Sequence, residues 1–394
     1  GVCPFSHIPN LEFIGCRTVK INYENHKEEG KHVKPGTLFV VRHIFNFASA
    51  IELINSSNIR IEDVILHANP GPGVTGKKSK NITIRRLKVL PRGNRIMSTN
   101  VDATHFAGCY GTIDFEDCYF EGMGDDAANV HGRYHNVKDR LDPKTILAKI
   151  NGTVGVDIES PDVGDRVEFI RLGDLLPYGE GKVESITSSN KEGHLKITFT
   201  GDLPEQLKAD DLFSNSTKLA RIRFVNCKAK DIRGRAILIQ SRGALIEGCT
   251  FDHCTGQGIH VDTSAKWNES IGTRDIIIRN NTFIGCGYGR TGYCDAAGIV
   301  VETESHRPAV GVHKNIIIEG NVIHGKNDLY QDNEKPGILL ACVEGGTIRN
   351  NTIEHCHPSI HLAYTDNIEI KNNTMSDDTI IFNNKTVRRK MGCP

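Results

Sequence analysis

The stretch IIIRNN (276–281) decides the fold, because its pattern returns along most of the chain. It is an alternating β-branched run, followed by a small polar pair that mostly ends in Asn or Cys. The pattern ends at residues 64, 87, 118, 227, 249, 281, 321, 351 and 373. Its shortest intervals are 22 and 23 residues, as between 227 and 249 or between 64 and 87. This period with strand alternation is typical of a parallel β-helix, in which each repeat is one rung and stacks on its neighbours.

A second strand follows the turn of each repeat and also aligns in columns. One column holds residues 128, 237, 259, 299, 338 and 360, and another holds 130, 239, 261 and 301. We expect these mostly branched residues to point inward, so the residues between them must point outward. The outward column holds His131, Gln240, Asp262, Glu302 and Ala341. The sequence therefore predicts a polar row across four rungs.

The last residue of each turn is predicted to stack inside the coil. Such stacked amides would form a ladder made of Asn281, Asn321, Asn351 and Asn373. These residues also suit tight turns, because Asn tolerates the left-handed conformation. Several of the twelve cysteines fall at the same point of the repeat and none is in a CxxC pair, so we expect mostly reduced, buried thiols. Cys286 and Cys294 are the best pair for a local disulfide.

The repeat disappears between residues 118 and 227. From residue 137 to about 219 the chain reads VGVDIES, DRVEFIRL, GKVESI and HLKITFTG, with turn residues between these segments. This pattern predicts a small antiparallel barrel or sandwich inserted in one rung loop, beside His131, where it would shape a cleft wall. We therefore expect an all-β protein. Residues 1–136 and 220–394 would form a right-handed parallel β-helix, and residues 137–219 an inserted antiparallel β-barrel.

Composition and charge exclude several classes of protein. Lys+Arg and Asp+Glu are both 48 in 394 residues, which argues against nucleic acid or an anionic membrane surface as the main partner. No run of eighteen apolar residues exists, so we expect no membrane span. The first residues, GVCPFSHIPN, lack the charged and apolar regions of an export signal. We expect a secreted or periplasmic protein from which any signal has been removed.

Three aspartates are the candidate catalytic residues. Asp125 and Asp126 open an outward strand and are followed by two small alanines, while Asp102 lies in the corresponding strand of the preceding rung. Rungs are about 4.8 Å apart, so Asp102 should fall close to the pair. Three carboxylates repel one another, and at least one should keep its proton near neutral pH. Glycoside hydrolysis needs this arrangement, with one acid for the leaving oxygen and ionised carboxylates to activate or replace water.

Other side chains and other chemistries fit the same region. Candidates for binding sugar hydroxyls are His131, Arg235, Asp262 and Glu302. Trp267, the only indole, would either stack on a sugar ring or anchor a packed loop, and His105 is expected to be structural. Clustered aspartates can also hold Ca²⁺, and a polysaccharide lyase would add a basic proton abstractor. A carbohydrate-binding β-helix without catalysis would need no aspartate trio.

Two families resemble the chain at these residues. The motifs NxD (100–102) and GDD (124–126) resemble the β-helical polygalacturonases of glycoside hydrolase family 28. That match fails where His131-Gly132 follows at once and no Arg-Ile-Lys motif appears. The chain is more similar to glycoside hydrolase family 110, the α-1,3-galactosidases acting on blood-group-B and linear α-1,3-galactosyl structures. The similar segments are STNVDATHFAGCYG (98–111), DDAANVHG (125–132), SRGALIEGCTF (241–251) and AKWNESIGTRDIIIRNNTFIGCGYG (265–289).

The resemblance to family 110 implies an inverting exo-α-galactosidase that needs no metal and no cofactor. Its partner would be a glycan with a terminal α-galactose. By position in the motif, Asp125 would be the general acid, and Asp102 and Asp126 would hold the attacking water. Inverting carboxylates about 6.5–9.5 Å apart fit two neighbouring rungs. A polygalacturonase-like hydrolase stays as the alternative enzyme and would require an open groove with a basic patch.

Overall fold

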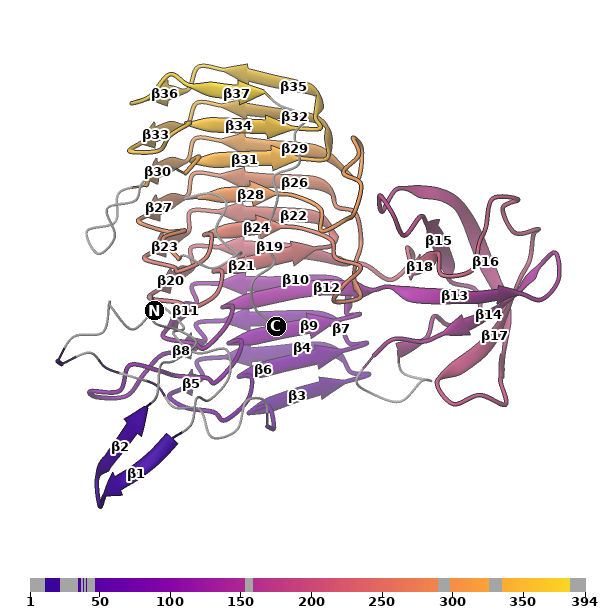
Figure 1. Cartoon of the computed structure of the whole chain (residues 1–394), viewed down its shortest axis with the longest axis horizontal. Coiled ribbons are helices and arrows are strands. Elements are labelled where there is room, and N and C mark those ends of the chain that lie inside the picture. The colour runs from indigo at the N-terminus through magenta and orange to yellow at the C-terminus, as the bar shows by residue number, and fades with distance from the viewer. Residues whose placement is uncertain are drawn as a thin grey trace.

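The fold is known from a computed structural model, which describes residues 11–21, 35–36, 38, 40, 47–152, 159–289, 298–325 and 335–382. The strands of these residues form three long parallel sheets, a closed barrel to one side and a small hairpin (Figure 1). None of the described segments is a helix long and apolar enough to cross a membrane. The sheet order confirms the predicted all-β fold, a parallel β-helix with an antiparallel barrel.

Each rung places one strand in each of the three long sheets. The first sheet, which carries the aspartates, contains β3 (Ile51–Ile54), β6 (Val74–Lys77), β9 (Thr104–Ala107), β12 (Ala128–Arg133), β21 (Ile237–Gln240), β24 (Ile259–Val261), β28 (Ile299–Val301), β31 (Ile338–Ala341), β34 (Ile360–Ala363) and β37 (Ile380–Phe382), with β25 (Glu269–Ser270) beside β12. The second contains β4 (Ser57–Glu62), β7 (Lys80–Arg85), β10 (Tyr110–Glu116), β19 (Ala220–Val225), β22 (Arg242–Glu247), β26 (Arg274–Arg279), β29 (His313–Glu319), β32 (Val343–Arg349) and β35 (Asp366–Lys371). The third contains β5 (Ile65–Leu66), β8 (Lys88–Val89), β11 (Tyr119–Glu121), β20 (Lys228–Lys230), β23 (Thr250–Asp252), β27 (Thr282–Ile284), β30 (Val322–His324), β33 (Thr352–Glu354) and β36 (Thr374–Met375).

The barrel and the hairpin complete the strands. The closed barrel contains β13 (His135–Arg140), β14 (Thr145–Lys149), β15 (Arg166–Ile170), β16 (Pro177–Ser188), β17 (His194–Phe199) and β18 (Leu212–Asn215). The hairpin pairs β1 (Leu11–Gly15) with β2 (Thr18–Ile21). The barrel leaves the β-helix directly after β12 and stands beside the coil (Figure 1). Arg242 on β22 forms a bidentate ion pair with the buried Glu168 on β15, with N–O distances of 2.6 and 2.8 Å.

The inward columns predicted for the first sheet are confirmed by its register. Ala128 pairs with Ile237, and the same column continues through Ile259, Ile299, Ile338 and Ile360. All of these side chains are buried in one continuous apolar core. One rung alone could not bury this face, so each rung depends on its neighbours for stability.

A ladder of thiols and amides runs through the turn between the second and third sheets. The backbone N–H of Cys118 donates to Cys227 Sγ, and the N–H of Cys227 donates to Cys249 Sγ, both at 3.4 Å. The side chain of Asn281 then takes over as acceptor, and Asn321, Asn351 and Asn373 follow it in hydrogen bonds of 2.9–3.0 Å. The predicted amide ladder is therefore present.

The ladder residues do not adopt the left-handed conformation that the sequence had suggested for them. The positive φ angles belong to the residues just before, such as Asn280 at 56° and Asn350 at 55°. The turn needs its left-handed residue at the exposed corner, and the next side chain then points into the coil. The cysteines of the ladder are free and buried, and so is Cys286, whose Sγ donates to the Phe251 carbonyl. Cys294, its predicted disulfide partner, lies outside the described residues.

Candidate active site

The three aspartates predicted from the sequence lie together on the first sheet. Asp102 precedes β9, and Asp125 and Asp126 precede β12, which is the next strand of that sheet. Each of the three offers a carboxylate oxygen that lies within 4.8 Å of the others. This is closer than the separation of about 6.5–9.5 Å that we expected for inverting carboxylates. The close approach follows from the register, because Asp102 and Asp126 occupy the same column of adjacent rungs.

Asp126 is held by a guanidinium from the following rung. Arg235 Nε donates to Asp126 Oδ1 at 2.9 Å, and Nη2 donates to Oδ2 at 2.6 Å. The backbone N–H of Arg235 adds a third bond to Oδ1 at 2.7 Å. Burial raises the pKa of Asp126 and Arg235 opposes this rise. Because a guanidinium does not lose its proton, this bidentate pair keeps Asp126 as a carboxylate. Arg235, predicted to bind sugar hydroxyls, therefore serves first as the partner of Asp126.

Asp125 has no such partner. Among the described residues, none forms an ion pair with its carboxyl group, although it lies beside Asp126 and Asp102. Burial, and then the charges of Asp126 and Asp102, raise the pKa of Asp125 to about 7. A carboxylic acid with this pKa holds a proton near neutral pH and can release it during a reaction. Space beside the pair is provided by Gly234, where any Cβ would lie 2.5 Å from Asp126 Oδ1.

Asp102 pairs with a histidine. Its Oδ2 lies 2.5 Å from His105 Nδ1, and its Oδ1 accepts a 3.3 Å bond from the Asp126 N–H. Burial lowers the pKa of His105, but the hydrogen bond and charge of Asp102 outweigh this, so the pKa is raised overall. His105 in turn contacts His131, with 2.9 Å between the two Nε2 atoms. His105, expected to be structural, therefore belongs to the site.

His131 is placed differently from the prediction. Its side chain is fully buried, Nδ1 lies 2.6 Å from the Gly132 carbonyl oxygen, and Nε2 is used by His105. Both ring nitrogens are therefore engaged by the protein. Binding of a sugar hydroxyl by His131 stays a prediction, and it would require one of these two contacts to be exchanged for a contact with the sugar.

A loop from a later rung closes over this region. After Thr263 the chain returns as the short strand β25, which runs antiparallel to β12 and pairs Glu269 with Arg133. Glu269 Oε1 lies 3.8 Å from His131 Nε2. Burial raises the pKa of Glu269, while the charges of His105, Arg235 and Arg133 oppose the rise. Glu269 thus joins the electrostatics of the aspartate site from a segment that rung alignment does not reach.

The same loop carries Trp267. Its side chain is 51% exposed, with Lys266 Nζ lying 5.3 Å from the ring centroid. The exposure rules out the alternative in which Trp267 is a packed loop anchor. An exposed indole two residues before Glu269 is compatible with stacking on a sugar ring, which stays the prediction for Trp267.

Asp262 and Glu302 lie in the predicted outward column but far from the trio. They sit two and three rungs beyond Asp126, which corresponds to about 10 and 14 Å at the usual strand spacing. Both are buried, and Glu302 Oε1 lies 3.0 Å from His260 Nε2. The residues of the polar row point outward from the coil, but they are buried and not exposed to solvent. The structure does not bring these two residues to the aspartates.

Two groups of side chains at the site have donor atoms close enough to share a cation: the aspartate trio, and His105 with His131 and Glu269. The Arg235 guanidinium already occupies both oxygens of Asp126 and would repel a cation beside it. A cation at the second group would have to replace the bond between the two histidines. These residues fit a proton-transfer site better than a cation site, and the absence of a required metal stays a prediction.

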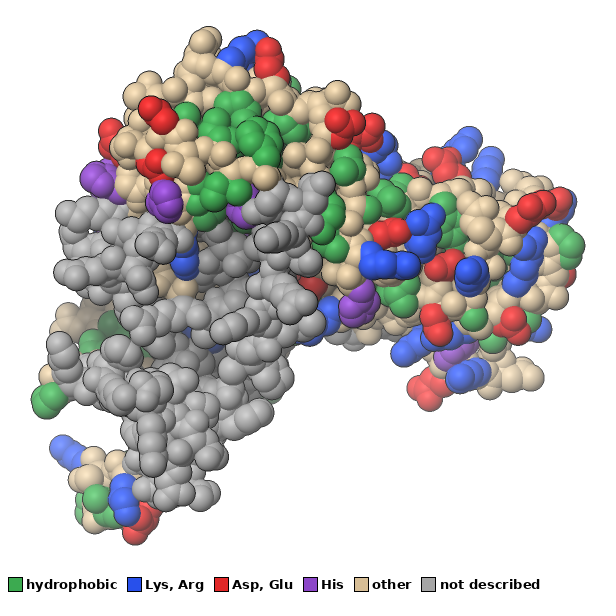
Figure 2. All heavy atoms as spheres, turned by 45° about the horizontal axis from the view of Figure 1, so that its top comes forward, with side chains coloured by type: hydrophobic (Ala, Val, Ile, Leu, Met, Phe, Trp, Pro, Cys, Tyr) green, Lys and Arg blue, Asp and Glu red, His purple; other side chains and the backbone are tan. Residues whose placement is uncertain are grey.

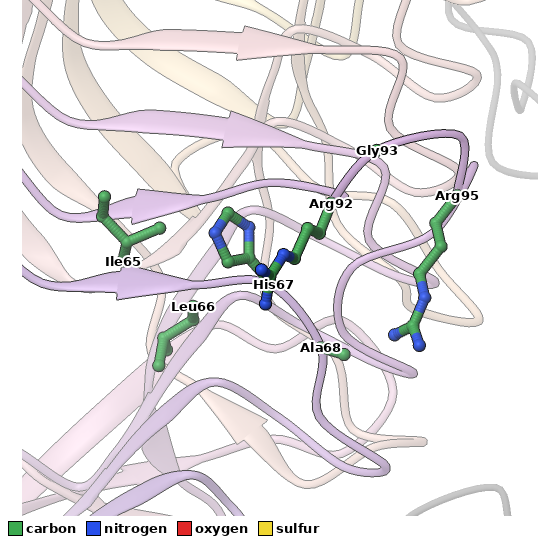
Figure 3. A pocket seen from close by; sticks show the side chains of 7 residues that line it. All are labelled: Ile65, Leu66, His67, Ala68, Arg92, Gly93 and Arg95. Carbon is green, nitrogen blue, oxygen red and sulfur yellow. The ribbon is translucent and has the colours of Figure 1, made fainter.

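A large cavity lies away from the aspartates. It measures about 750 Å³ on the N-terminal rungs and is lined by Ile65, Leu66, His67, Ala68, Arg92, Gly93 and Arg95. Figure 3 shows Arg92 and Arg95 extending in different directions from their loop. None of the three aspartates lines this cavity. On the face in Figure 2, acidic and basic side chains are interspersed over the barrel and form no continuous basic patch.

The sequence is similar to known protein families and to several named enzymes. The family described as "GLAA-B beta-barrel domain II" matches residues 152–213, and "Right handed beta helix region" matches 198–325 and 293–386. Alpha-1,3-galactosidase B of Phocaeicola vulgatus is 28% identical over 370 residues, which are 88% of this chain and 61% of the relative. Alpha-1,3-galactosidase A of Akkermansia muciniphila is 30% identical over 305 residues, which are 76% of this chain and 50% of the relative. Alpha-1,3-galactosidase A of Bacteroides fragilis is 28% identical over 330 residues, which are 81% of this chain and 52% of the relative.

The chain is a homologue of the α-1,3-galactosidases. This confirms the resemblance seen in the sequence. The chain spans roughly half to three fifths of the length of these α-1,3-galactosidases. Among solved structures, the tailspike gp61 of Pseudomonas phage phi297 aligns over 71% of this chain and 57% of its own, with a TM-score of 0.24 and 11% identity, too little to support an argument.

Two residues of this α-1,3-galactosidase homologue escaped the sequence analysis as site residues. His105 lies three positions after Asp102, and an Asp-x-x-His spacing at a strand start was the available signal. Glu269 sits inside the segment AKWNESIG, which was quoted only for the family resemblance. Nothing in the repeat pattern indicates that this loop returns to pair with β12.

Proposed function

We propose that this protein is an exo-acting glycoside hydrolase that releases terminal α-1,3-linked galactose with inversion. One observation carries the proposal: the carboxyl groups of Asp126 and Asp102 are each hydrogen-bonded to a cationic or proton-bearing side chain, whereas none of the described residues forms an ion pair with Asp125. Asp126 is paired with Arg235, and Asp102 with His105. The pKa of Asp125, raised to about 7, allows this residue to hold a proton near neutral pH and to give it away. The names of the relatives support galactose as the sugar released.

In the proposed reaction, Asp125 donates its proton to the glycosidic oxygen as the bond from that oxygen to the anomeric carbon breaks. Water attacks the same carbon from the opposite side and gives its proton to a carboxylate. Asp102 is the better proton acceptor, because its Oδ1 accepts only one long backbone bond of 3.3 Å, whereas three donors of Arg235 bind the two oxygens of Asp126 at 2.6–2.9 Å. Two neighbouring carboxylates can also orient one water molecule through its two hydrogens.

The close spacing of the trio makes stereochemistry the sharpest test. Retaining enzymes typically hold their two carboxyl groups about 5–5.5 Å apart, nearer to the 4.8 Å limit seen here. We expect NMR of the first sugar formed from galactosyl-α-1,3-galactose to show β-galactose, the product of inversion. Initial α-galactose would instead mean a covalent intermediate on Asp102 or Asp126.

The role of Asp125 has its own test. Asp125→Asn keeps the shape of the side chain and removes the transferable proton, so we expect turnover to fall at least ~10²-fold. Circular dichroism should show the same strand content as the unmodified protein. Near-normal turnover of this variant would remove Asp125 from the mechanism. Release of galacturonic acid, with no cleavage of the galactoside, would favour the polygalacturonase-like alternative.

A further inference from the structure

A series of hydrogen bonds leads from Asp102 through the half-buried His105 and the buried His131 to a backbone carbonyl. Asp102 Oδ2 lies 2.5 Å from His105 Nδ1, and His105 Nε2 lies 2.9 Å from His131 Nε2. His131 Nδ1 lies 2.6 Å from the Gly132 oxygen. The two rings meet edge to face, with an interplanar angle of 88°. Turning either ring by 180° would put carbon atoms into both of its contacts, so the positions of the nitrogens are fixed.

The Gly132 carbonyl determines where the protons of His131 are. A carbonyl oxygen only accepts, so His131 Nδ1 must carry a hydrogen and donate it. Burial, followed by the charges of Arg133 and His105, lowers the pKa of His131 well below its ordinary value. The ring is then neutral, and its Nε2 has a lone pair and no hydrogen. His131 Nε2 can therefore only accept from His105.

His105 consequently has to donate from Nε2, and only its Nδ1 is left to face Asp102. The contact between Nδ1 and Asp102 Oδ2 then holds one shared proton. The groups facing His105 are Asp102 before β9, His131 and Arg133 on β12, and Glu269 on β25. Two carboxylates against one guanidinium favour the charged ring, so the shared proton belongs on His105.

We propose that His105 and His131 are positioning residues that make Asp102 the proton acceptor of the reaction. Gly132 fixes the tautomer of His131, His131 requires His105 to donate from Nε2, and His105 holds its second proton against an ionised Asp102. The catalytic role of these hydrogen bonds rests on the proposed hydrolysis. The positions of the protons do not depend on it, and they can be measured without substrate.

The first test is ¹H–¹⁵N NMR of the histidine side chains in the full chain, without substrate, between pH 5 and 8. We expect His131 to be a neutral Nδ1–H ring throughout, and His105 to carry hydrogens on both nitrogens. His131 protonated at Nε2, or His105 neutral at pH 6, would overturn the proposal. If these signals are as expected and galactose is still not released, the proposed function fails while the proton arrangement stands.

Matched variants of His131 test the consequence for turnover. His131→Leu removes the acceptor for His105 Nε2, so we expect kcat to fall on the order of 10²-fold, with KM changed much less. His131→Gln can offer an amide oxygen near the old Nε2 position, and it should recover part of the loss. The acidic limb of the pH–rate profile should also move in His131→Leu. Equal activity and equal pH profiles in the two variants would mean that the histidines only fill space.

Discussion

At the scale of single residues, three chemically identical carboxyl groups differ in how readily they hold or accept a proton, because their hydrogen-bond partners differ. Asp126 is hydrogen-bonded to a guanidinium and Asp102 to an imidazole, whereas Asp125 lies beside these two carboxylates and forms no ion pair with any described residue. Arg235 comes from the rung after the insertion, and His105 comes from the strand that Asp102 itself opens. A division of roles between acid and base follows from these partners without any difference in residue type.

The unpaired state of Asp125 predicts a stability that depends on pH. Its folded pKa is raised to about 7, so its stabilising contribution is complete below the unfolded pKa and is lost as pH rises through 7. Asp125→Asn removes this titration. The variant should therefore be more stable than the unmodified protein at pH 8, by an amount that shrinks at pH 5 and below. Thermal unfolding at several pH values measures this difference.

Asp126→Asn is the matched control for that experiment. It leaves the buried Arg235 without its carboxylate, so it should destabilise the fold at every pH from 5 to 8. The two amide variants are thus expected to shift the melting temperature in opposite directions at pH 8. A rise for both, or a constant shift for Asp125→Asn across the pH range, would contradict the pairing described here.

Trp267 gives a second prediction at this scale. If its exposed indole stacks on a sugar ring, Trp267→Ala should raise KM about 3- to 10-fold, since such contacts are worth about 0.5–1.5 kcal/mol. The melting temperature should hardly change, because the side chain is half exposed. Steady-state kinetics with Lys266→Ala as the control separates the indole from its neighbouring charge. An unchanged KM in Trp267→Ala would remove the indole from the site.

At the scale of the element, the amide ladder predicts where the coil is most sensitive. Asn321 accepts from the Asn281 backbone and side chain and donates to the Ile278 carbonyl and to Asn351. Asn321→Leu leaves these groups buried and unpaired, at about 1–3 kcal/mol for each. Asn373→Leu is the control, because Asn373 is half-buried at the end of the ladder and water can replace it. Denaturant unfolding should show a clearly larger loss for Asn321→Leu, and similar losses would argue against the ladder.

The sequence predicted the backbone of these elements better than the side-chain contacts between them. Alternation and the 22–23-residue period were enough to place Ala128 above Ile237 and Asp102 one rung from Asp126. The repeat fixes the backbone register, and it says nothing about a loop that folds back. Glu269 was therefore missed as a site residue. The burial of His131 was also not foreseen, because a residue that faces outward from the rung is here covered by the loop that carries β25.

At the scale of the whole molecule, the barrel holds the loop that carries Trp267 and Glu269. Three contacts tie this loop to the insertion or its stem: Thr263 to Tyr134 at 2.7 Å, Asn268 to Asn151 at 2.9 Å, and Ser270 to Ser214 at 2.6 Å. The barrel is in turn tied to the β-helix by Arg242 and Glu168. The position of the loop that carries the exposed indole therefore depends on how firmly the barrel is docked.

Docking of the barrel can be tested through this ion pair. Arg242→Met leaves Glu168 buried without its cation and should cost about 3–5 kcal/mol of stability. Arg242→Met with Glu168→Leu removes both charges, so it should recover most of that loss in denaturant unfolding. Because a looser barrel frees the loop without touching the aspartates, KM should rise in the single variant while kcat changes little. A fall in kcat at constant KM would show instead that the barrel acts on the carboxylates themselves, through β12.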